Sequence, residues 1–334
     1  MGVFVKLPGG NNKNKKLATV YHQDLWGERE LFGETAKGKE LVGGKYYWLA
    51  ENDVSSTQWE TLKPSSPFYL FKPQNTDLLA EYQKGWKVSE AMPVNSVGIL
   101  TARDKLTIGF TKDDIWETVT NFAALSVEEA RRKYDLGKDS RDWKVEFAQK
   151  DLKKSGISQS KIASILYRPF DVRYTYYTGK SRGFHCTPRG EMMDNMVAGE
   201  NLGLVFMRQV ALQKNYSHFV VTNLIADNRL CYSNKGYTSL APLYLYPKDN
   251  PTLFDRPPTK APGGRSPNFA PEFTKDFSTR LNMTYIEDGK GDGKTTFGPE
   301  DIFNYMYAFF HSPTYRQRYA EFLKTDFPRL PLTS

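Results

Sequence analysis

The sequence predicts a mixed α/β (α+β) protein with twisted mixed sheets, flanking helices and a C-terminal helical pair. Three observations lead to this prediction. Short runs of aromatic and β-branched residues, typical of strands, occupy the first 110 residues and return over 162–247. Capped helical segments lie between these two regions, and helical periodicity returns at the C-terminal end. The length of 334 residues favours about two domains of ordinary size.

The first third of the chain is predicted to form short strands separated by loops rich in glycine and lysine. Residues 3–7 alternate like a strand, and 46–49 and 68–71 are aromatic strand candidates. Residues 98–101 and 105–110 are predicted to pair as a hairpin around Arg103 and Asp104. This region therefore reads as mainly β.

Helical signals begin at Thr111. Thr111 with Asp114, and Ser126 with Glu129, have the spacing of capping boxes, which predicts a helix after Thr111 and a second one that ends near Tyr134. Ser140 is predicted to cap a third helix, in which Trp143 and Phe147 share one face. The lysine- and glycine-containing segment 153–156 is the predicted boundary between two lobes.

The second half of the chain returns to strands and ends in helices. Strands are predicted over 172–178, 202–208, 219–221 and 243–246, with one helix over 190–198 that Gly199 ends. A helix is predicted from Glu300 to His311, followed by a second one with Ser312 and Pro313 as its N-cap and first residue, running to about Lys324. We therefore expect an N-terminal α/β lobe over 1–154, a strand-rich lobe over 155–250, a long loop or hairpin excursion over 251–296, and C-terminal helices over 297–334 that pack on the lobes.

Composition excludes several classes of protein. The 46 Lys and Arg residues outnumber the 38 Asp and Glu residues, and a net charge of +8 favours a polyanionic partner such as nucleic acid. No stretch approaches the roughly 20 apolar residues of a membrane span, and no secretory signal is visible, so we expect no membrane association. The two cysteines, Cys186 and Cys231, are too far apart for a CxxC metal site and are predicted to be reduced thiols of a cytoplasmic protein.

Motifs that would indicate catalysis are incomplete. Residues 289–295 resemble a phosphate-binding loop, but Asp288 stands where the first glycine is required. Residues 66–69 resemble the tetrapeptide of amino-methyltransferases, with Phe68 in place of the second proline. Asp135, Asp142 and Lys144 fit a nuclease pattern only loosely, because the last two fall in the third predicted helix. We therefore assign no catalytic residue and no metal ligand.

The densest chemical signal is the segment 167–189. It interleaves six aromatic residues with five cations and a single acid, Asp171. Cations attract phosphates, and arginine also pairs with guanine edges, while aromatic side chains offer rigid contact area. Strand alternation predicts that Arg173 shares a face with Thr175 and Tyr177. A second cluster contains Arg208 and Gln209 at the end of a predicted strand and Lys214 in the following turn.

At this point the sequence resembles a known family. The segments IASILYRPFDVRYTYYTG, RGEMMDNMVAGENLGLVFMRQV, HFVVTNLIADNRL, PLYLYP and FNYMYAFFHSPTYRQRYAEFLKTDFPRLPL closely resemble, in this order, the C-terminal specificity region of type ISP restriction-modification enzymes. The upstream segment NSVGILTARDKLTIGFTKDDI is similar to the same region. The resemblance runs from about residue 45 to the end of the chain.

The resemblance implies a division of labour. Such enzymes join a nuclease, a helicase-like ATPase, an N6-adenine methyltransferase and a target recognition domain in one polypeptide, and this chain corresponds to the last part. It implies a target-recognition-domain-like fold, with 155–250 as the DNA-recognition lobe and double-stranded DNA as the partner. The chain would not be an enzyme on its own, and would position DNA for the methyltransferase part of the same parent polypeptide. It would bind no cofactor, because S-adenosylmethionine, ATP and magnesium are expected only for the methyltransferase and helicase-nuclease parts.

The candidate DNA-binding residues come from these two clusters and comprise seven cations, one tyrosine and one glutamine. They are Arg168, Arg173, Tyr177, Lys180, Arg182, Arg189, Arg208, Gln209 and Lys214. Two alternatives stay open. One is a magnesium-dependent nuclease fragment that uses Asp135, Asp142 and Lys144, and the other is an RNA- or glycan-binding module whose aromatic side chains stack on the ligand.

Overall fold

The structure, a computed structural model, describes residues 18–66, 69–73, 75, 77–210, 216–231, 235–248 and 257–332. Internal contacts divide the chain into two compact units, Met1–Thr76 and Asp77–Ser334. This division falls at residue 76, whereas the regions expected from the sequence meet at residues 154, 250 and 296. The N-terminal strand expected over 3–7 lies outside the described residues.

The first unit is built from two short β-ribbons and one helix. Strand β1 (Val20–His22) pairs antiparallel with β4 (Glu60–Leu62), and β2 (Leu31–Thr35) forms a hairpin with β3 (Gly38–Gly43). Helix α1 (Lys45–Glu51) contains the residues predicted as the strand 46–49, so that prediction is wrong. The β-propensity of its aromatic residues is a weak preference that the surroundings override. The described part of the candidate 68–71 is not a strand either.

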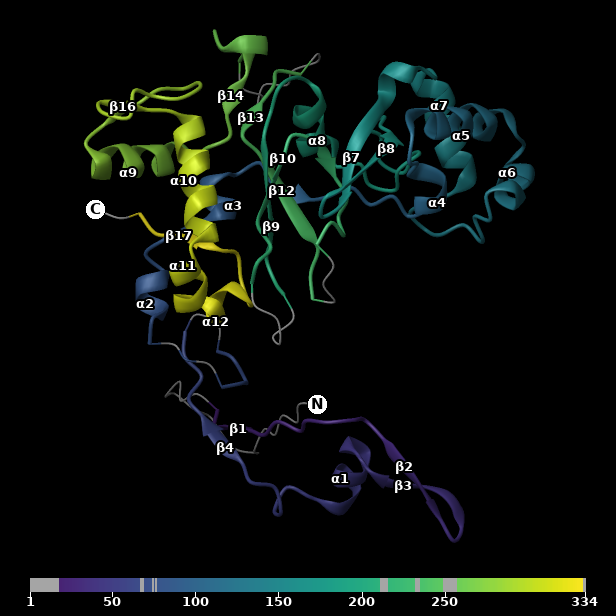
Figure 1. Cartoon of the computed structure of the whole chain (residues 1–334), viewed down its shortest axis with the longest axis vertical. Helices are drawn as coiled ribbons and strands as arrows, with labels where there is room; N and C mark the ends of the chain where they lie inside the picture. Colours follow the sequence, from purple (N-terminus) through teal and green to yellow (C-terminus); the bar gives the residue numbers. More distant parts are fainter. Residues whose placement is uncertain are drawn as a thin grey trace, which may run out of the picture. The chain divides into compact units, whose positions relative to one another are not determined.

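The second unit contains the two larger sheets (Figure 1). A four-stranded antiparallel sheet has the order β10 (Val220–Thr222), β9 (Gly203–Met207), β12 (Thr238–Pro242) and β6 (Ser96–Val97). A three-stranded sheet has β7 (Ile162–Arg168) in the centre, antiparallel to β8 (Asp171–Tyr176) and parallel to β11 (Ile225–Ala226). The mixed α/β class is confirmed, and so are the strands predicted over 172–178, 202–208 and 219–221.

Three two-stranded ribbons complete the β-structure of this unit. They are β5 (Trp86–Lys87) with β17 (Arg329–Leu330), β13 (Tyr244–Leu245) with β14 (Ser266–Pro267), and the parallel pair β15 (Thr284–Tyr285) with β16 (Thr296–Phe297). The region expected to be a loop or hairpin also contains helix α9 (Pro271–Leu281). Phe273 and Phe277, one helical turn apart, are both buried, and this apolar face explains why a helix forms there.

Helices gather next to β8. They are α4 (Asp104–Thr107), α5 (Lys112–Ala124), α6 (Val127–Lys133) and α7 (Val145–Ser155). The capping boxes at Thr111 and Ser126 are both confirmed, since each side chain accepts from the backbone three residues on and the acid there accepts in return. The predicted hairpin around Arg103 and Asp104 is wrong, because α4 begins at Asp104 and the Arg103 carbonyl accepts its first helical hydrogen bonds.

The third predicted helix begins later than expected. The hydroxyl of Ser140 accepts from the Trp143 backbone N–H at 3.1 Å, but α7 begins only at Val145. Trp143 therefore precedes the helix, where its fully buried ring anchors the incoming loop. Ser140 therefore caps a turn that precedes α7, and it is not the N-cap of the helix itself.

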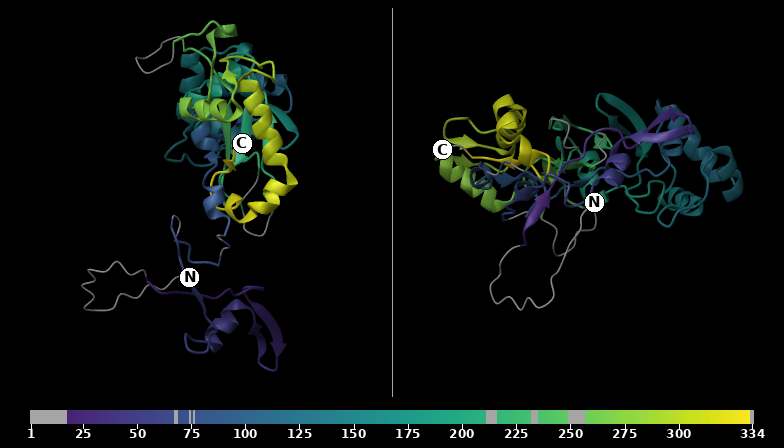
Figure 2. Two further views of the ribbon diagram at one scale, coloured as in Figure 1. Left: turned by 90° about the vertical axis from the view of Figure 1, so that its left-hand side faces the viewer. Right: turned by 90° about the horizontal axis from the view of Figure 1, so that it is seen from below.

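The remaining helices belong mainly to the region around the first hydrophobic core. They are α2 (Leu79–Tyr82), α3 (Val88–Ala91), α8 (Gly190–Val197), α10 (Pro299–His311), α11 (Pro313–Arg318) and α12 (Ala320–Leu323), with 3-10 turns at Gln159–Lys161 and Pro262–Gly264. The C-terminal helical pair is confirmed, and Figures 1 and 2 show α10 and α11 following one another along the unit. The second helix is interrupted at Tyr319, which separates α11 from α12. No helix in the described ranges is long and apolar enough to cross a membrane.

Two hydrophobic cores hold the second unit together. One surrounds the four-stranded sheet and includes β9, β12 and the inner faces of α8, α9 and α10. The other lies between α5, α7 and the end of β8, with Phe122, Trp143 and Phe184 at its centre. The hairpin β7–β8 therefore has its open end packed in the second core, and its turn lies at the other end of the strands.

Candidate nucleic-acid interface

The structure separates the basic and aromatic segment 167–189 into two places. Arg168 and Arg173 belong to the turn end of the β7–β8 hairpin, whereas Lys180, Arg182 and Arg189 follow the opposite end of β8. Strand β8 separates the two places, and its six residues of extended chain span about 20 Å. The five cations therefore do not form one continuous contact surface.

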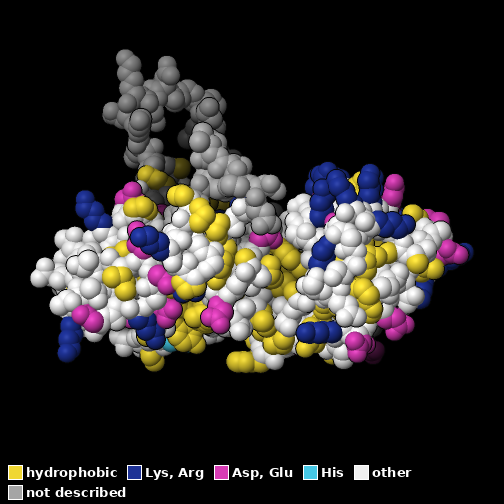
Figure 3. All heavy atoms as spheres, turned by 90° about the horizontal axis from the view of Figure 1, so that it is seen from above, with side chains coloured by type: hydrophobic (Ala, Val, Ile, Leu, Met, Phe, Trp, Pro, Cys, Tyr) yellow, Lys and Arg dark blue, Asp and Glu magenta, His cyan; other side chains and the backbone are white. Residues whose placement is uncertain are grey.

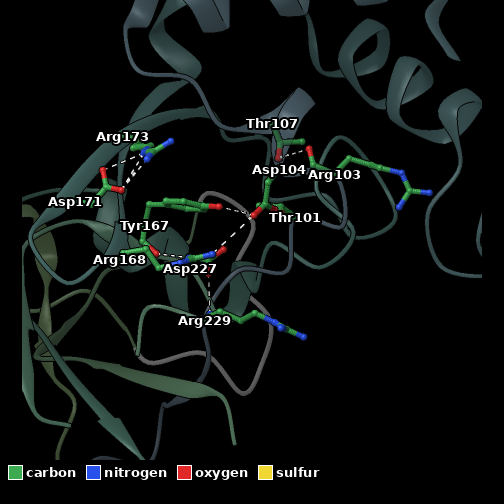
Figure 4. Close-up of polar contacts among 10 residues, drawn as sticks. All are labelled: Thr101, Arg103, Asp104, Thr107, Tyr167, Arg168, Asp171, Arg173, Asp227 and Arg229. Atoms are coloured by element: carbon green, nitrogen blue, oxygen red, sulfur yellow. Dashed lines mark hydrogen bonds and ion pairs between the residues drawn. The ribbon is translucent and has the colours of Figure 1, made fainter. Parts of the chain in front are cut away.

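Arg168 is held inside the fold by an ion pair (Figure 4). Its Nη1 lies 2.8 Å from Oδ1 of Asp227, whose side chain is only 4% exposed. The same carboxylate accepts the backbone N–H of Arg229 at 2.8 Å. Burial raises the pKa of Asp227, while the Arg229 N–H and the Arg168 guanidinium act in the opposite direction. Arg168 thus compensates a buried charge and is not free to bind phosphate with its whole guanidinium.

Arg173 stabilises the turn between β7 and β8 through its contact with Asp171. Its guanidinium makes a bidentate contact with Asp171, at 3.0 and 2.9 Å, and hydrogen bonding to Arg173 lowers the pKa of that carboxyl (Figure 4). The guanidinium also lies 4.1 Å from the ring centroid of Phe110 and 4.8 Å from that of Tyr167. The Tyr167 hydroxyl donates to Oδ2 of Asp104 at 2.7 Å, and burial raises the pKa of Tyr167 to about 12. These contacts make the turn rigid.

Tyr177 does not have the exposed position expected of a ligand contact. It is buried, and its hydroxyl donates to Oδ1 of Asp194 in α8 at 2.7 Å. Burial raises the pKa values of both Tyr177 and Asp194. Thr175 and Tyr176 are also buried, so the end of β8 has no open face. Packing explains this burial, because Tyr177 contacts α8 through Asp194, Thr175 contacts Thr107 and His185, and Tyr176 belongs to the second core.

Lys180 and Arg182 lie on an exposed loop that is fixed to α7. The buried carboxylate of Asp151 in α7 accepts from the Thr178 hydroxyl at 2.7 Å and from the Phe184 backbone N–H at 2.9 Å, one contact on each side of the two cations. The Arg182 side chain is 65% exposed, with Nη2 3.7 Å from Asp142 Oδ1. The loop therefore presents its cations from a defined position.

Helix α7, which Asp151 joins to this loop, carries three further exposed lysines. They are Lys150, Lys153 and Lys154. Figure 3 shows Lys and Arg side chains gathered densely on the half of the molecule that carries α5–α7. We call the set Lys150, Lys153, Lys154, Lys180 and Arg182 the basic surface. The α7 lysines were not among the candidates chosen from the sequence, in which 153–156 was interpreted as a boundary between two lobes.

Arg189 is less available than the two loop cations. It precedes α8 with a φ of +58°, is half-buried, and its Nε has no hydrogen-bond partner among the described residues. The position favours a role in the entry to α8.

Arg208 and Gln209 lie at the end of β9, beside the C-terminal helices. The Arg208 side chain is 60% exposed, with Nε 3.5 Å from Asp326 Oδ1, and the Gln209 amide donates to the Thr325 carbonyl at 3.3 Å. The loop that leads into β12 is adjacent, because a Cβ on Gly236 would lie 3.0 Å from the Gln209 carbonyl oxygen. Arg229, exposed in that same loop, joins them near this end of the sheet. Lys214 lies outside the described residues.

The residues of the nuclease alternative are not brought together. Asp135 pairs with Lys105 at 3.2 Å, and Asp142 pairs with Arg141 at 2.8 Å. Lys144 lies 5.1 Å from the centroid of the Phe147 ring. Within the described ranges, no group of three or more His, Cys, Asp or Glu side chains is placed to hold a metal ion.

One comparison with known proteins identifies a family. The family model described as the type ISP C-terminal specificity domain matches residues 90–334. No curated protein was found to be similar to the chain.

Solved structures with a similar fold include a DrdV–DNA complex and two type ISP restriction-modification enzymes. A cryo-electron microscopy structure of a DrdV–DNA complex has 18% identity and a TM-score of 0.57, and the match covers 86% of this chain and 27% of that one. A nuclease-deletion mutant of the type ISP enzyme LlaGI with a DNA substrate mimic has 18% identity and a TM-score of 0.52, covering 84% and 24%. The ATP-dependent type ISP enzyme LlaBIII bound to DNA has 16% identity and a TM-score of 0.55, covering 83% and 17%. The chain thus spans between 17% and 27% of these proteins, and at such identities the likeness concerns the fold.

Proposed function

Because the chain belongs to the type ISP C-terminal specificity domain family, we propose that it recognises a specific sequence in double-stranded DNA and has no catalytic centre of its own. The family match over residues 90–334 is the observation that carries the proposal. It is supported by the three fold neighbours, each of which is described in complex with DNA or a DNA substrate mimic.

The chemistry of the parent enzyme would reside elsewhere. The chain would position DNA for an N6-adenine methyltransferase in the same polypeptide, in the cytoplasm where cellular DNA is met. S-adenosylmethionine, ATP and magnesium would serve that methyltransferase and a helicase-nuclease part. A base inside a duplex is out of reach of a methyltransferase until it is extruded, so a separate reader that fixes register is mechanistically useful.

The basic surface is suited to phosphate contact. Lys180 and Arg182 extend from a loop that Asp151 holds on α7, next to three exposed lysines. Contacts of this kind set the position of a protein on the duplex without reading its sequence. Sequence would be read by polar side chains near the sheet end, where Arg208, Gln209 and Arg229 lie, since arginine and glutamine pair with guanine and adenine edges.

Replacing Lys180 and Arg182 together with alanine is expected to weaken binding to every duplex by about tenfold at roughly 0.1 M salt, because two phosphate contacts and their released counterions are lost. The slope of log affinity against log salt should fall in magnitude by about 2. Fluorescence anisotropy of a labelled random-sequence 30-bp duplex, titrated with the full chain from low to moderate salt, measures both quantities.

A matched control removes the same charge elsewhere. Lys290→Ala with Lys294→Ala changes two exposed lysines in the loop between β15 and β16 and should leave the slope unchanged. If the double variant Lys180→Ala with Arg182→Ala had the same salt slope as wild type, this loop would not contact the DNA phosphates. Tighter binding to duplex RNA or to an oligosaccharide than to duplex DNA would contradict the proposed function itself.

A further inference from the structure

Phe170 forms the tip of the β7–β8 hairpin. Arg168 pairs with Asp171, so Pro169 and Phe170 alone make the turn between the two strands. The Phe170 side chain is 100% exposed, and its φ is +64°. A large apolar residue thus has no contact with the fold and occupies a backbone region that favours glycine.

The folded state on its own would favour a different residue here. A two-residue turn with proline first and a positive φ second is the usual place for glycine or asparagine. A bulky residue with positive φ is uncommon and strained, and strain of this kind is typical of functional positions. Full exposure removes the compensating gain that burial of the ring would give.

The turn that carries Phe170 is stiff. Arg173 holds Asp171 with two contacts, Arg168 holds Asp227, and the backbone of Tyr174 exchanges two hydrogen bonds with Gly109 at 2.9 and 3.0 Å. Val172 in β8 is 50% exposed, and Phe110, whose ring centroid lies 4.1 Å from the Arg173 guanidinium, is 71% exposed, so further apolar surface lies near the turn. A rigid apolar projection of this shape is suited to insertion, not to solvation.

The charges around the tip permit a polyanion to approach. The carboxylates of Asp171 and Asp227 are each paired with an arginine, and Asp104 accepts from the Tyr167 hydroxyl. The loop that contains Asp227 continues to the exposed Arg229. Two of the three nearby acids are therefore paired with arginines, and the third accepts a hydrogen bond, so none of these carboxylates is left without a partner beside the tip.

We propose that Phe170 is an apolar wedge that enters a base step of the recognised duplex and partly unstacks it. This inference rests on the proposed function and deepens it. Proteins that kink DNA insert phenylalanine or leucine between base pairs in this way, and sequence-dependent step flexibility then contributes to specificity. A step opened by Phe170 would also lower the cost of extruding a nearby adenine.

The test uses the full chain and duplexes of 30 bp that it enriches from a random-sequence pool. 2-Aminopurine is placed at successive positions of one enriched duplex, so that its fluorescence reports unstacking. Wild type should raise the fluorescence at one step several-fold. Phe170→Gly should lose that signal and bind about tenfold more weakly, while Phe170→Leu should keep the signal and bind within about threefold of wild type.

Thermal unfolding separates this role from a structural one. Phe170→Gly should melt at the same temperature as wild type or about 1–2 °C higher, because strain at the positive φ is relieved. Val197→Ala, which trims another exposed apolar side chain at the end of α8, should change neither binding nor fluorescence.

Three outcomes would overturn the inference. In the first, Phe170→Gly keeps wild-type binding and fluorescence, while alanine at Lys180 and Arg182 weakens binding. The domain would then recognise DNA without a wedge, and the tip would instead contact another protein. If Phe170→Gly melts well below wild type, the side chain serves the fold. If wild type enriches no duplex at all, the proposed function fails and the wedge with it.

Discussion

Replacing Arg168 with methionine is expected to lower the free energy of unfolding by about 3 kcal/mol at neutral pH, because removal of one partner leaves a buried carboxylate uncompensated. The Asp227 side chain is 4% exposed and lies 2.8 Å from the lost guanidinium. It keeps the Arg229 backbone N–H, and the Arg168 side chain is itself 33% exposed, so the loss should fall at the low end of the usual range. Urea unfolding of the full chain measures the change.

Three comparisons identify the cause of that loss. Arg168→Met combined with Asp227→Asn should recover most of the stability, because no buried charge remains. Burial already raises the pKa of Asp227, so the deficit of Arg168→Met should shrink as the pH falls and the carboxyl is protonated. Arg229→Met, an exposed cation of the same loop, should stay within about 0.5 kcal/mol of wild type. If Arg168→Met alone were as stable as wild type, the Arg168–Asp227 ion pair would not contribute to stability.

This ion pair also illustrates what the sequence could not provide. Arg168 was identified as a DNA contact from its cationic, aromatic neighbourhood, yet its partner Asp227 lies 59 residues away. Charge density along the chain does not distinguish a cation that binds a ligand from one that balances a buried acid. Lys180 and Arg182 are exposed in a loop in which glycine and serine stand beside them, and this turn composition was visible in the local sequence.

The same contrast holds for the fold. The capping boxes at Thr111 and Ser126 depend on residues three positions apart, and the sequence predicted them correctly. The short helix α4 was missed because long-range contacts stabilise it. The Arg103 guanidinium donates to the carbonyls of Leu136 and Lys138, more than 30 residues away, and lies 4.9 Å from the Trp143 ring centroid.

Tyr177 shows how packing reverses a correct local reading. Strand alternation placed Arg173, Thr175 and Tyr177 on one face, and β8 is indeed a strand. The sequence did not reveal that α8 would supply Asp194 as a partner for the Tyr177 hydroxyl, or that Thr175 would contact Thr107 and His185. Candidate contacts on a strand can be chosen from sequence only where the covering element is also known.

Acidification from pH 6.5 to 4 is expected to remove about 3 kcal/mol of stability through His185 alone. Burial lowers the pKa of His185 from 6.5 to about 4, so the unfolded chain binds a proton in this window and the folded chain does not. Stability from this group is therefore complete above pH 6.5 and is lost as the pH falls toward 4.

The hydrogen bonds of His185 explain why it resists protonation. The Thr175 hydroxyl donates its proton to the Thr107 carbonyl at 2.6 Å, so His185 Nε2, at 2.8 Å, must donate to Thr175. Nδ1 is then an unprotonated nitrogen, buried without a partner among the described residues. A second proton would place both a charge and an unsatisfied N–H in the core, which is costly.

A glutamine at this position isolates the effect. His185→Gln retains a side-chain N–H for Thr175 but has no titrating ring, so its unfolding free energy should decline by about 3 kcal/mol less than wild type between pH 6.5 and 4. His311→Gln, a change in α10 where His311 Nδ1 contacts the Tyr307 carbonyl at 2.9 Å, should follow the wild-type curve. Parallel curves for wild type and His185→Gln would show that the acid sensitivity comes from other groups.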